Sequence, residues 1–388
     1  MKTGAFHVPT KVVFGVNVVE TLGDIVKSYN TDKVFLVTDG GIVKSGLAEK
    51  ISNILKKASI SCDVFDKVEA NPTIPTVHNG AEQFNKNKEG VIIALGGGSA
   101  MDAAKGIAVK ATHEGGIDGY TRHGGKVVRD IVPPIIAIPT TAGTGSEVTW
   151  VSVLVNPEIK RKIVVPSPFI APKIALVDPV MTVTLPPHIT ASTGMDALTH
   201  AVEAYVSRNW NPISDAYALR AIQLVSNNLR QAVGNGENME HRYNMSLAST
   251  MAGIAFVTAG LGMVHSTAHA LGGRCNVPHG VANAIMLPLV SRYNVIAEPE
   301  KYRDIAQAMG EDVRGLNAME AGIEATEAMQ LLSEDIGIPK GLKELGLDES
   351  LIDQLAIDAM DDLGTFPINP RKANKQAVID LFKQAFEN

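Results

Sequence analysis

Short runs of apolar, β-branched residues recur through the first half of the chain, separated by amphipathic stretches near residues 41–57, 75–87 and 100–112. Strands buried on both faces of a sheet are continuously apolar, so these runs indicate strands and the stretches between them indicate helices. Their alternation predicts a largely parallel α/β sheet. The expected strands are Lys11–Phe14, Val34–Val37, Ser61–Phe65, Gly90–Leu95, Pro134–Ile138, Val151–Val155, Ile163–Val165 and Ile174–Val177.

The pattern changes after about Leu185, where Pro186 and Pro187 interrupt the chain and helical periodicity takes over. We therefore expect two domains, an α/β domain over residues 1–185 and an all-helical domain over residues 186–388. The long amphipathic helices expected in the second domain are Ser214–Val233, Met239–Ala259, Val281–Ala297 and Asn317–Ile336.

Composition indicates an ordinary soluble globular protein, with 388 residues, 45% of them hydrophobic and 20% charged. The net charge of -6 argues against nucleic acid or an anionic membrane surface as a partner. No apolar run has membrane-spanning length, and the N-terminus shows no signal-peptide pattern. The two cysteines, Cys62 and Cys275, cannot build a disulfide framework. We expect a cytoplasmic protein.

A candidate metal site lies in the second half of the chain. If the stretch from Thr193 to His200 is helical, Asp196 and His200 project from one face, one turn apart. His265 and His279 can complete a set of one carboxylate and three imidazoles, which suits Fe²⁺, Zn²⁺ or a similar divalent ion. The alternatives are that Asp196 caps a helix that starts at Thr193, and that the histidines are ordinary core residues with local partners.

A glycine-rich segment, Gly96–Ser99, follows a strongly apolar strand and precedes an expected helix. Its backbone N–H groups and the helix dipole can hold a pyrophosphate. Met101 stands where the usual G-x-G-x-x-G fingerprint needs its last glycine, so a tight turn without a ligand is an equal interpretation. In that interpretation Asp102 is a partner of the helix dipole in the first turn.

Two further segments at strand ends suit a nucleotide. Asp39, just after an expected strand, can accept hydrogen bonds from a ribose diol and repel a 2′-phosphate, which favours NAD over NADP. The hydroxyls and glycines of residues 140–146 suit ribose, phosphate or amide contacts. A simple turn aspartate and an ordinary polar loop are the alternatives.

Four blocks together, in this order, resemble the iron-containing (group III) alcohol dehydrogenase family: Gly96–Lys105, Thr140–Glu147, Gly194–Tyr205 and Pro278–Ala284. The match runs nearly end to end. The resemblance implies an N-terminal α/β dinucleotide-binding domain with a mainly parallel sheet, an all-α C-terminal domain, a dehydroquinate synthase-like architecture and a homodimer or higher homo-oligomer. It also implies metal ligands at Asp196, His200, His265 and His279, and an active-site histidine at His269.

The same resemblance implies that NAD is the cofactor and that the residue at position 39 distinguishes NAD from NADP. Without it, Asn71 would be a turn residue, and residues 160–162 a solvated face. The nucleotide contacts it implies are Asp39, Asn71, Gly97, Gly98, Ser99, Asp102, Thr140, Thr141, Thr144, Thr149 and Lys162.

The function expected from these features is an NAD- and divalent-metal-dependent alcohol dehydrogenase or aldehyde reductase. Its substrate would be a small alcohol, a diol or a functionalised aldehyde, reduced or oxidised by hydride transfer. His269 would exchange the proton as a general acid or base. Two alternatives remain: a carbon-oxygen lyase of the dehydroquinate synthase type that uses NAD transiently, and a metal-binding scaffold or nucleotide sensor without turnover.

Two charged residues have open roles. Glu203 lies on the same helical face as Asp196 and His200, so it either orients a metal ligand or forms a salt bridge. Arg274 would favour an anionic group on the aldehyde if it faces the site, and otherwise is an exposed arginine.

Overall fold

A computed structural model describes residues 4–87, 90–122, 124–159 and 161–387. The chain groups into two compact units. The first, here the α/β unit, comprises Val8–Thr141 and Gly145–Thr184. The second, the helical unit, comprises the chain from Leu185 onward, the short segment Ala142–Thr144 and the described residues up to His7.

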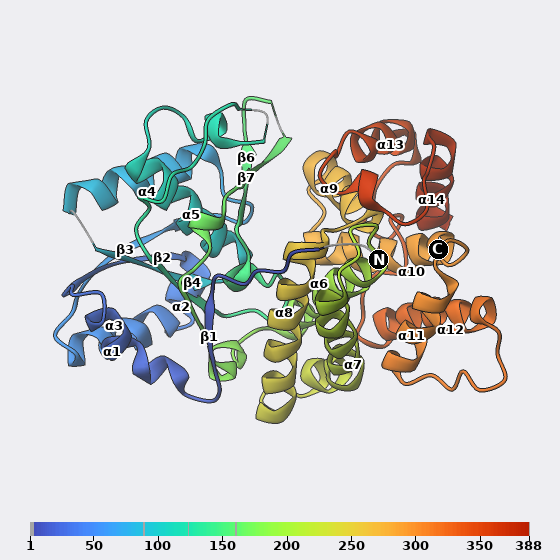
Figure 1. Cartoon of the computed structure of the whole chain (residues 1–388), viewed down its shortest axis with the longest axis horizontal. Helices are drawn as coiled ribbons and strands as arrows, with labels where there is room; N and C mark the ends of the chain where they lie inside the picture. Colours follow the sequence, from blue (N-terminus) through green and yellow to red (C-terminus); the bar gives the residue numbers. More distant parts are fainter. Residues whose placement is uncertain (1–3, 88–89, 123, 160, 388) are drawn as a thin grey trace. The chain divides into compact units, whose positions relative to one another are not determined.

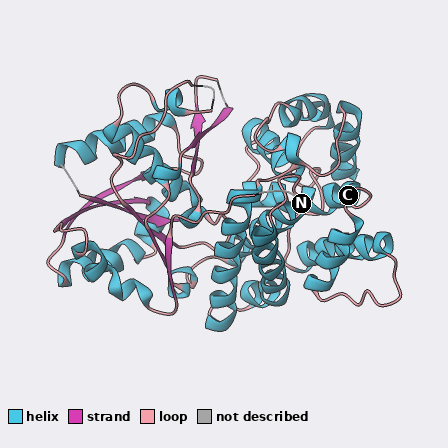
Figure 2. Ribbon diagram, viewed as in Figure 1, coloured by secondary structure: helices cyan, strands magenta, loops and turns pink. Residues whose placement is uncertain are grey.

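The α/β unit contains a six-stranded sheet in which all neighbouring strands are parallel. Figure 2 shows these strands in magenta. β4 and β5 in the centre are buried at every position, as their continuous apolar sequences predict. In sheet order the strands are β1 (Lys11–Phe14), β8 (Ile174–Val177), β5 (Ile135–Pro139), β4 (Val91–Gly96), β2 (Lys33–Asp39) and β3 (Ser61–Val68).

Helices cover both faces of this sheet, because alternate residues of its strands point to opposite sides. Phe35 and Val37 of β2 join one apolar core, whereas Val34 and Leu36 join the other. α4 (Ile74–Asn87) and α5 (Gly98–Thr112) contribute to the first core, and α1 (Leu22–Lys27) and α3 (Leu47–Lys57) to the second. α2 (Gly40–Lys44) precedes α3, and the break between them falls at Gly46, whose φ is +81°.

Two further strands, β6 (Val151–Asn156) and β7 (Arg161–Pro166), form a separate antiparallel hairpin. Too few residues connect them for a parallel crossover, which takes a dozen or more. The shorter 3₁₀ helices of the chain are η1 (Val18–Thr21), η2 (Ile117–Tyr120), η3 (Ser146–Val148), η4 (Pro168–Ile170), η5 (Pro179–Thr182), η6 (Glu349–Leu351) and η7 (Phe366–Ile368).

The helical unit is built around α6, which packs against α7, α8 and α10 (Figure 1). Because neighbours surround it, α6 is buried along almost its whole length, including its polar residues Asp196, His200 and Glu203. Buried polar groups require partners, so this helix marks the place to look for a site. The helices are α6 (Pro187–Val206), α7 (Pro212–Gly234), α8 (Met239–Ala259), α9 (Met263–Cys275), α10 (His279–Asn294), α11 (Pro299–Met309), α12 (Ala318–Asp335), α13 (Ile352–Met360) and α14 (Lys375–Glu387).

Within the described ranges, no single helix is long and apolar enough to cross a membrane. α8 and α9 pass that test only as a pair, bent by 103° at the break between them, and both contribute many residues to the core of the helical unit.

Candidate active site

α6 places Asp196 and His200 one turn apart on one face, both almost fully buried. The helix runs without interruption from Pro187, so Asp196 lies in its interior. The Thr193 hydroxyl donates to the carbonyl of Ile189 at 2.8 Å. The alternative in which Asp196 caps a helix start at Thr193 is therefore wrong.

α9 and α10 bring two more imidazoles to Asp196. The Nε2 atoms of His200, His265 and His279 lie 3.9, 3.9 and 3.6 Å from Oδ1 of Asp196. Ligand atoms held about 2.1 Å from one tetrahedral ion lie about 3.4 Å apart, so these spacings fit a first-row divalent cation. Asp196, His265 and His279 form the most compact group, with ligand atoms mutually within 4.8 Å, and His200 adjoins it through Asp196.

Neighbouring acceptors fix the tautomers of two of these histidines. Nδ1 of His265 lies 2.6 Å from Oε2 of Glu203, and Nδ1 of His200 lies 3.2 Å from the carbonyl oxygen of Gly143. Each Nδ1 therefore carries the proton, and each Nε2 presents its lone pair to the cluster. Gly143 can lie this close to α6 because it has no Cβ atom. A Cβ atom there would lie only 2.7 Å from Cβ of Thr193 and would clash with it.

Glu203 thus contacts a candidate ligand directly, which the sequence left open. Its other carboxylate oxygen accepts the backbone N–H of Val264 at 2.7 Å. Burial raises the pKa of Glu203 to about 7, a rise that the surrounding N–H donors limit. Burial and the neighbouring His200 hold the pKa of His265 well below its usual value, so His265 is the neutral imidazole that a metal requires.

His269 lies one turn after His265 on α9 and pairs with Asp362, a residue that sequence reasoning missed. Nδ1 of His269 lies 2.7 Å from Oδ2 of Asp362, and the backbone N–H of Gly364 donates to the other carboxylate oxygen at 3.0 Å. Burial raises the pKa of Asp362, but the hydrogen bond and charge of His269, with the hydrogen bonds from Thr365 and Gly364, together outweigh it and lower the pKa to about 2. No motif surrounds Asp362, so the sequence held no local signal for it.

Asn283 is the second residue missed. Its amide Nδ2 lies 2.7 Å from Oδ1 of Asp196 and 3.3 Å from Nε2 of both His265 and His279. Asn283 follows His279 by four positions on α10, so the helical spacing was the available signal.

In the α/β unit, Asp39 meets the glycine loop at the carboxyl edge of the sheet. Oδ1 of Asp39 accepts the N–H groups of Gly41 and Ile42, at 2.8 and 3.0 Å, and so caps α2. Gly96 ends β4 with φ +148°, and a Cβ atom on it would lie 3.5 Å from Oδ2 of Asp39. This edge is where parallel sheets bind nucleotides.

The loop that opens α5 has the features of an anion site. Gly97 is the N-cap of α5 and makes no side-chain capping hydrogen bond, so the first-turn N–H groups are available to a phosphate. A Cβ atom on Gly97 would lie 3.2 Å from the Thr141 side chain. Oγ of Ser99 accepts the backbone N–H of Asn71 at 3.3 Å, and the N–H of Thr140 donates to the carbonyl of Gly96 at 3.0 Å. The structure thus gathers Asp39, Asn71, Gly97, Gly98, Ser99, Thr140 and Thr141.

The other residues expected at the cofactor have different neighbours. Asp102 accepts the Ser146 hydroxyl at 2.8 Å and the Val153 N–H at 3.1 Å, and so binds the β6–β7 hairpin to α5. The buried ammonium of Lys105 contacts the Thr149 hydroxyl at 3.2 Å. Lys162 lies on β7, where its charge counteracts the rise that burial causes in the pKa of Asp102. Thr144 groups with the helical unit.

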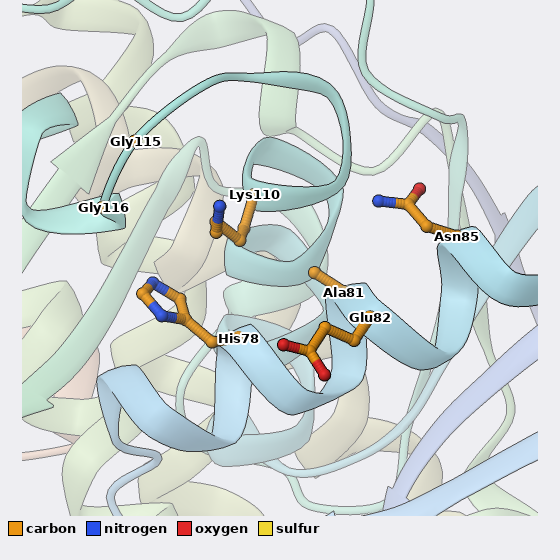
Figure 3. A pocket seen from close by; sticks show the side chains of 7 residues that line it. All are labelled: His78, Ala81, Glu82, Asn85, Lys110, Gly115 and Gly116. Carbon is orange, nitrogen blue, oxygen red and sulfur yellow. The ribbon is translucent and has the colours of Figure 1, made fainter.

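A separate hollow of about 310 Å³ lies between α4 and α5 (Figure 3). Its lining includes His78 and Glu82 of α4 and Lys110 of α5, and none of the residues expected at the site. Lys110 follows Gly98 by twelve residues, about 18 Å along a helix. The hollow therefore lies at the opposite end of α5 from the glycine loop.

The α/β unit has a parallel sheet with a glycine loop at its carboxyl edge, and the helical unit has a carboxylate–imidazole cluster. These two features are typical of metal- and nucleotide-dependent enzymes. Residues 9–179 match the family model for iron-containing alcohol dehydrogenase, and residues 190–386 match that for the C-terminal part of the Fe-containing alcohol dehydrogenase family. The chain belongs to the iron-containing alcohol dehydrogenase family.

Individual relatives agree over the whole length. The chain is 46% identical to a 1,3-propanediol dehydrogenase of Klebsiella pneumoniae, covering 98% of each chain. It matches a crystal structure of a 1,3-propanediol oxidoreductase with a TM-score of 0.96 and 44% identity, over 99% of this chain and 100% of that one. A sulfoacetaldehyde reductase from Bifidobacterium kashiwanohense, solved in complex with NAD⁺, matches with a TM-score of 0.90 and 32% identity over all of both chains.

These findings confirm two predictions. The fold class is an α/β domain with a parallel sheet plus an all-helical domain. The protein is an alcohol and aldehyde oxidoreductase of the iron-containing family, and the carbon-oxygen lyase is not favoured.

Proposed function

We propose that this enzyme interconverts a small alcohol or diol and its aldehyde, with NAD(H) as the hydride carrier and Fe²⁺ as the metal, or Zn²⁺ or another divalent cation in its place. The observation that carries the proposal is the convergence of Asp196, His265 and His279 with His200 beside them. The names of the relatives support it, since one is a 1,3-propanediol dehydrogenase and another was solved with NAD⁺.

The residues present fit such a cation. One carboxylate and three neutral imidazoles are a donor set for Fe²⁺ or Zn²⁺, and in this proposal Asp196, His200, His265 and His279 hold it. A bound divalent ion supplies Lewis acidity to the substrate oxygen, and NAD supplies or accepts the hydride. Glu203 and the Gly143 carbonyl fix the imidazole tautomers that such binding needs.

His269 exchanges the reaction's proton in this proposal. Asp362 holds the proton on Nδ1 of His269, which leaves Nε2 to take or give the substrate proton. The His269 side chain is 26% exposed, so solvent reaches part of this side chain. The His269 and His279 rings stack with centroids 5.4 Å apart, which places the acid–base group beside the cluster.

The nucleotide is assigned to the α/β unit. In this assignment Gly97, Gly98 and Ser99 bind the pyrophosphate at the start of α5, and Asp39 binds the adenosine ribose and selects NAD. Residues 1–185 then form the NAD-binding domain and residues 186–388 the metal-binding domain. The remaining contacts expected from the family are Asn71, Asp102, Thr140, Thr141, Thr144, Thr149 and Lys162.

The substrate is proposed to be neutral. Nε of Arg274 donates to Oδ2 of Asp358 at 2.7 Å, so the charge that would have favoured an anionic aldehyde is already paired. We also propose a homodimer, or a higher homo-oligomer, in the cytoplasm. The family resemblance supports the assembly, and the two cysteines, Cys62 and Cys275, neither of which forms a disulfide, support a reducing compartment.

The test is aldehyde-dependent oxidation of NADH under anaerobic conditions, with metal-stripped protein reconstituted with Fe²⁺ or Zn²⁺. A panel of short, hydroxylated and acidic aldehydes identifies the preferred substrate. We expect one alcohol formed per NADH oxidised, with short neutral or hydroxylated aldehydes preferred. Tight binding of metal and NADH without net oxidation of NADH by any aldehyde would contradict the proposal.

A further inference from the structure

Asn283 lies in the candidate metal cluster and within the family block Pro278–Ala284, but it is not one of the four expected ligands. It is completely buried, and its amide Nδ2 contacts Oδ1 of Asp196 at 2.7 Å and Nε2 of His265 and His279 at 3.3 Å each. These three contacted atoms are the compact ligand group itself. The amide therefore covers the face of the cluster formed by Asp196, His265 and His279.

The chemistry of the three acceptors fixes which way the amide points. The opposite orientation would place the amide oxygen 2.7 Å from the Asp196 carboxylate, acceptor against acceptor. Only Nδ2 can face this cluster. The consequence for the other end of the amide is unfavourable: Oδ1 of Asn283 is buried and has no hydrogen-bond partner among the residues the structure describes.

The amide has two hydrogens for three acceptors. An imidazole nitrogen has one lone pair, which cannot serve a metal and an N–H group together, whereas a carboxylate oxygen can accept more than one bond. When a cation takes the lone pairs of His265 and His279, the hydrogen bond to Oδ1 of Asp196 is the one that Asn283 can keep. That bond orients the Asp196 carboxylate. Because the side chain of Asn283 is neutral, it adds no anionic oxygen to the site.

We propose that Asn283 is a positioning residue of the metal centre, resting on the proposed metal binding. Its N–H group holds Oδ1 of Asp196 in place. Its neutral amide keeps the donor set at one carboxylate and three imidazoles, and so favours Fe²⁺, Co²⁺ and Zn²⁺ over cations that prefer more oxygen ligands. Partners of this kind are worth about 10- to 100-fold in metal affinity.

Two variants separate the two roles. Asn283→Ala removes the N–H donor, and we expect the affinity of the metal-stripped protein for Co²⁺ to fall about 10- to 100-fold. Asn283→Asp keeps the shape and adds a carboxylate oxygen close to Asp196. We expect it to raise the affinity for Mn²⁺ relative to Zn²⁺, because Mn²⁺ favours oxygen ligands. It should also change the visible absorption of bound Co²⁺, which reports the coordination number.

Asn228→Ala is the matched control. Asn228 is also a buried asparagine of the helical unit, but its hydrogen bonds go to Leu224, His241 and Asn244. It should bind Co²⁺ as wild type does. If both Asn283 variants retain wild-type Co²⁺ affinity and absorption and the wild-type preference for Zn²⁺, the inference is wrong while the metal site stands. If wild type itself binds no divalent cation, the proposed function fails and the inference with it.

Discussion

Nδ1 of His269 donates a hydrogen bond to Oδ2 of Asp362 across 2.7 Å, although 93 residues separate the two in the chain. α9 carries the histidine, and the segment that follows α13 carries the aspartate. The pairing keeps the proton on Nδ1 and leaves the lone pair on Nε2. A histidine that works as a general acid or base needs such an orienting partner.

Replacing Asp362 with asparagine should impair turnover without loss of metal. An amide N–H in place of the carboxylate would favour the wrong tautomer of His269, with its proton on Nε2. We expect kcat to fall about 10- to 100-fold, and His269→Ala to lower it about 10²- to 10⁴-fold. Both effects are measured as aldehyde-dependent NADH oxidation, with metal content determined on the same samples.

Asp358→Asn is the control for this change, since Asp358 is a nearby acidic residue whose partner is Arg274. It should leave kcat close to the wild-type value. Full activity in Asp362→Asn, or a loss in Asp358→Asn as large as in Asp362→Asn, would refute the orienting role.

Asp362 should also make the protein sensitive to acid. Its pKa of about 2 in the folded protein lies below the unfolded value near 3.9, so the folded state favours the carboxylate. The stabilisation, about 2 kcal/mol, is complete above about pH 4 and is lost as pH falls toward 2. Urea unfolding at pH 7 and at pH 3 should show a smaller loss for Asp362→Asn than for wild type. Equal losses would show that this carboxylate has an ordinary pKa.

Removing the charge of Asp39 should relax the choice between NADH and NADPH. We expect the ratio of kcat/KM for NADH to that for NADPH to fall about tenfold or more in Asp39→Asn, a difference of about 1.4 kcal/mol. Asparagine retains an oxygen that can accept the N–H groups of Gly41 and Ile42, so the cap of α2 is kept. An unchanged ratio would mean that Asp39 is only a helix cap.

Lys105 should be a structural requirement of the α/β unit. Its fully buried ammonium donates to Ser146 at 2.7 Å and to the carbonyl of Val151 at 2.9 Å, and burial lowers its pKa to about 8. Lys105→Met would leave the carboxylate of Asp102 buried without its cation, at a cost of about 3 kcal/mol. Denaturant unfolding measures this loss, and Lys105→Met with Asp102→Asn should recover part of it. Wild-type stability in Lys105→Met would contradict a structural role for the buried ammonium.

Much of the fold followed from the sequence, because strand and helix periodicities are local. β1, β8 and α8 have the expected ends. The differences have local causes as well. α10 starts at His279, directly after Pro278, and the stretch near residues 41–57 divides at Gly46. The pairing of β6 with β7 in a separate sheet was not predicted, since an apolar run does not show which strand it will pair with.

The site was less accessible to sequence reasoning. Asp196 and His200 share one helix, so their spacing indicated a joint role, and α9 and α10 bring His265 and His279 to them. Asn283 follows His279 by one helical turn, and this spacing was the available signal for it. Asp362 left no comparable pattern, because it acts through a contact between distant segments. Long-range contacts depend on packing in the core of the helical unit, which no local spacing encodes.

Metal content and turnover, measured on the same anaerobic preparations of wild type, His265→Ala and His269→Ala, test most directly whether this cluster holds a catalytic metal. We expect one divalent ion per chain and NADH-dependent aldehyde reduction in wild type, loss of both in His265→Ala, and retained metal with impaired turnover in His269→Ala. Wild-type turnover in His265→Ala, or in wild type stripped of metal, would contradict a catalytic role for a metal held by His265.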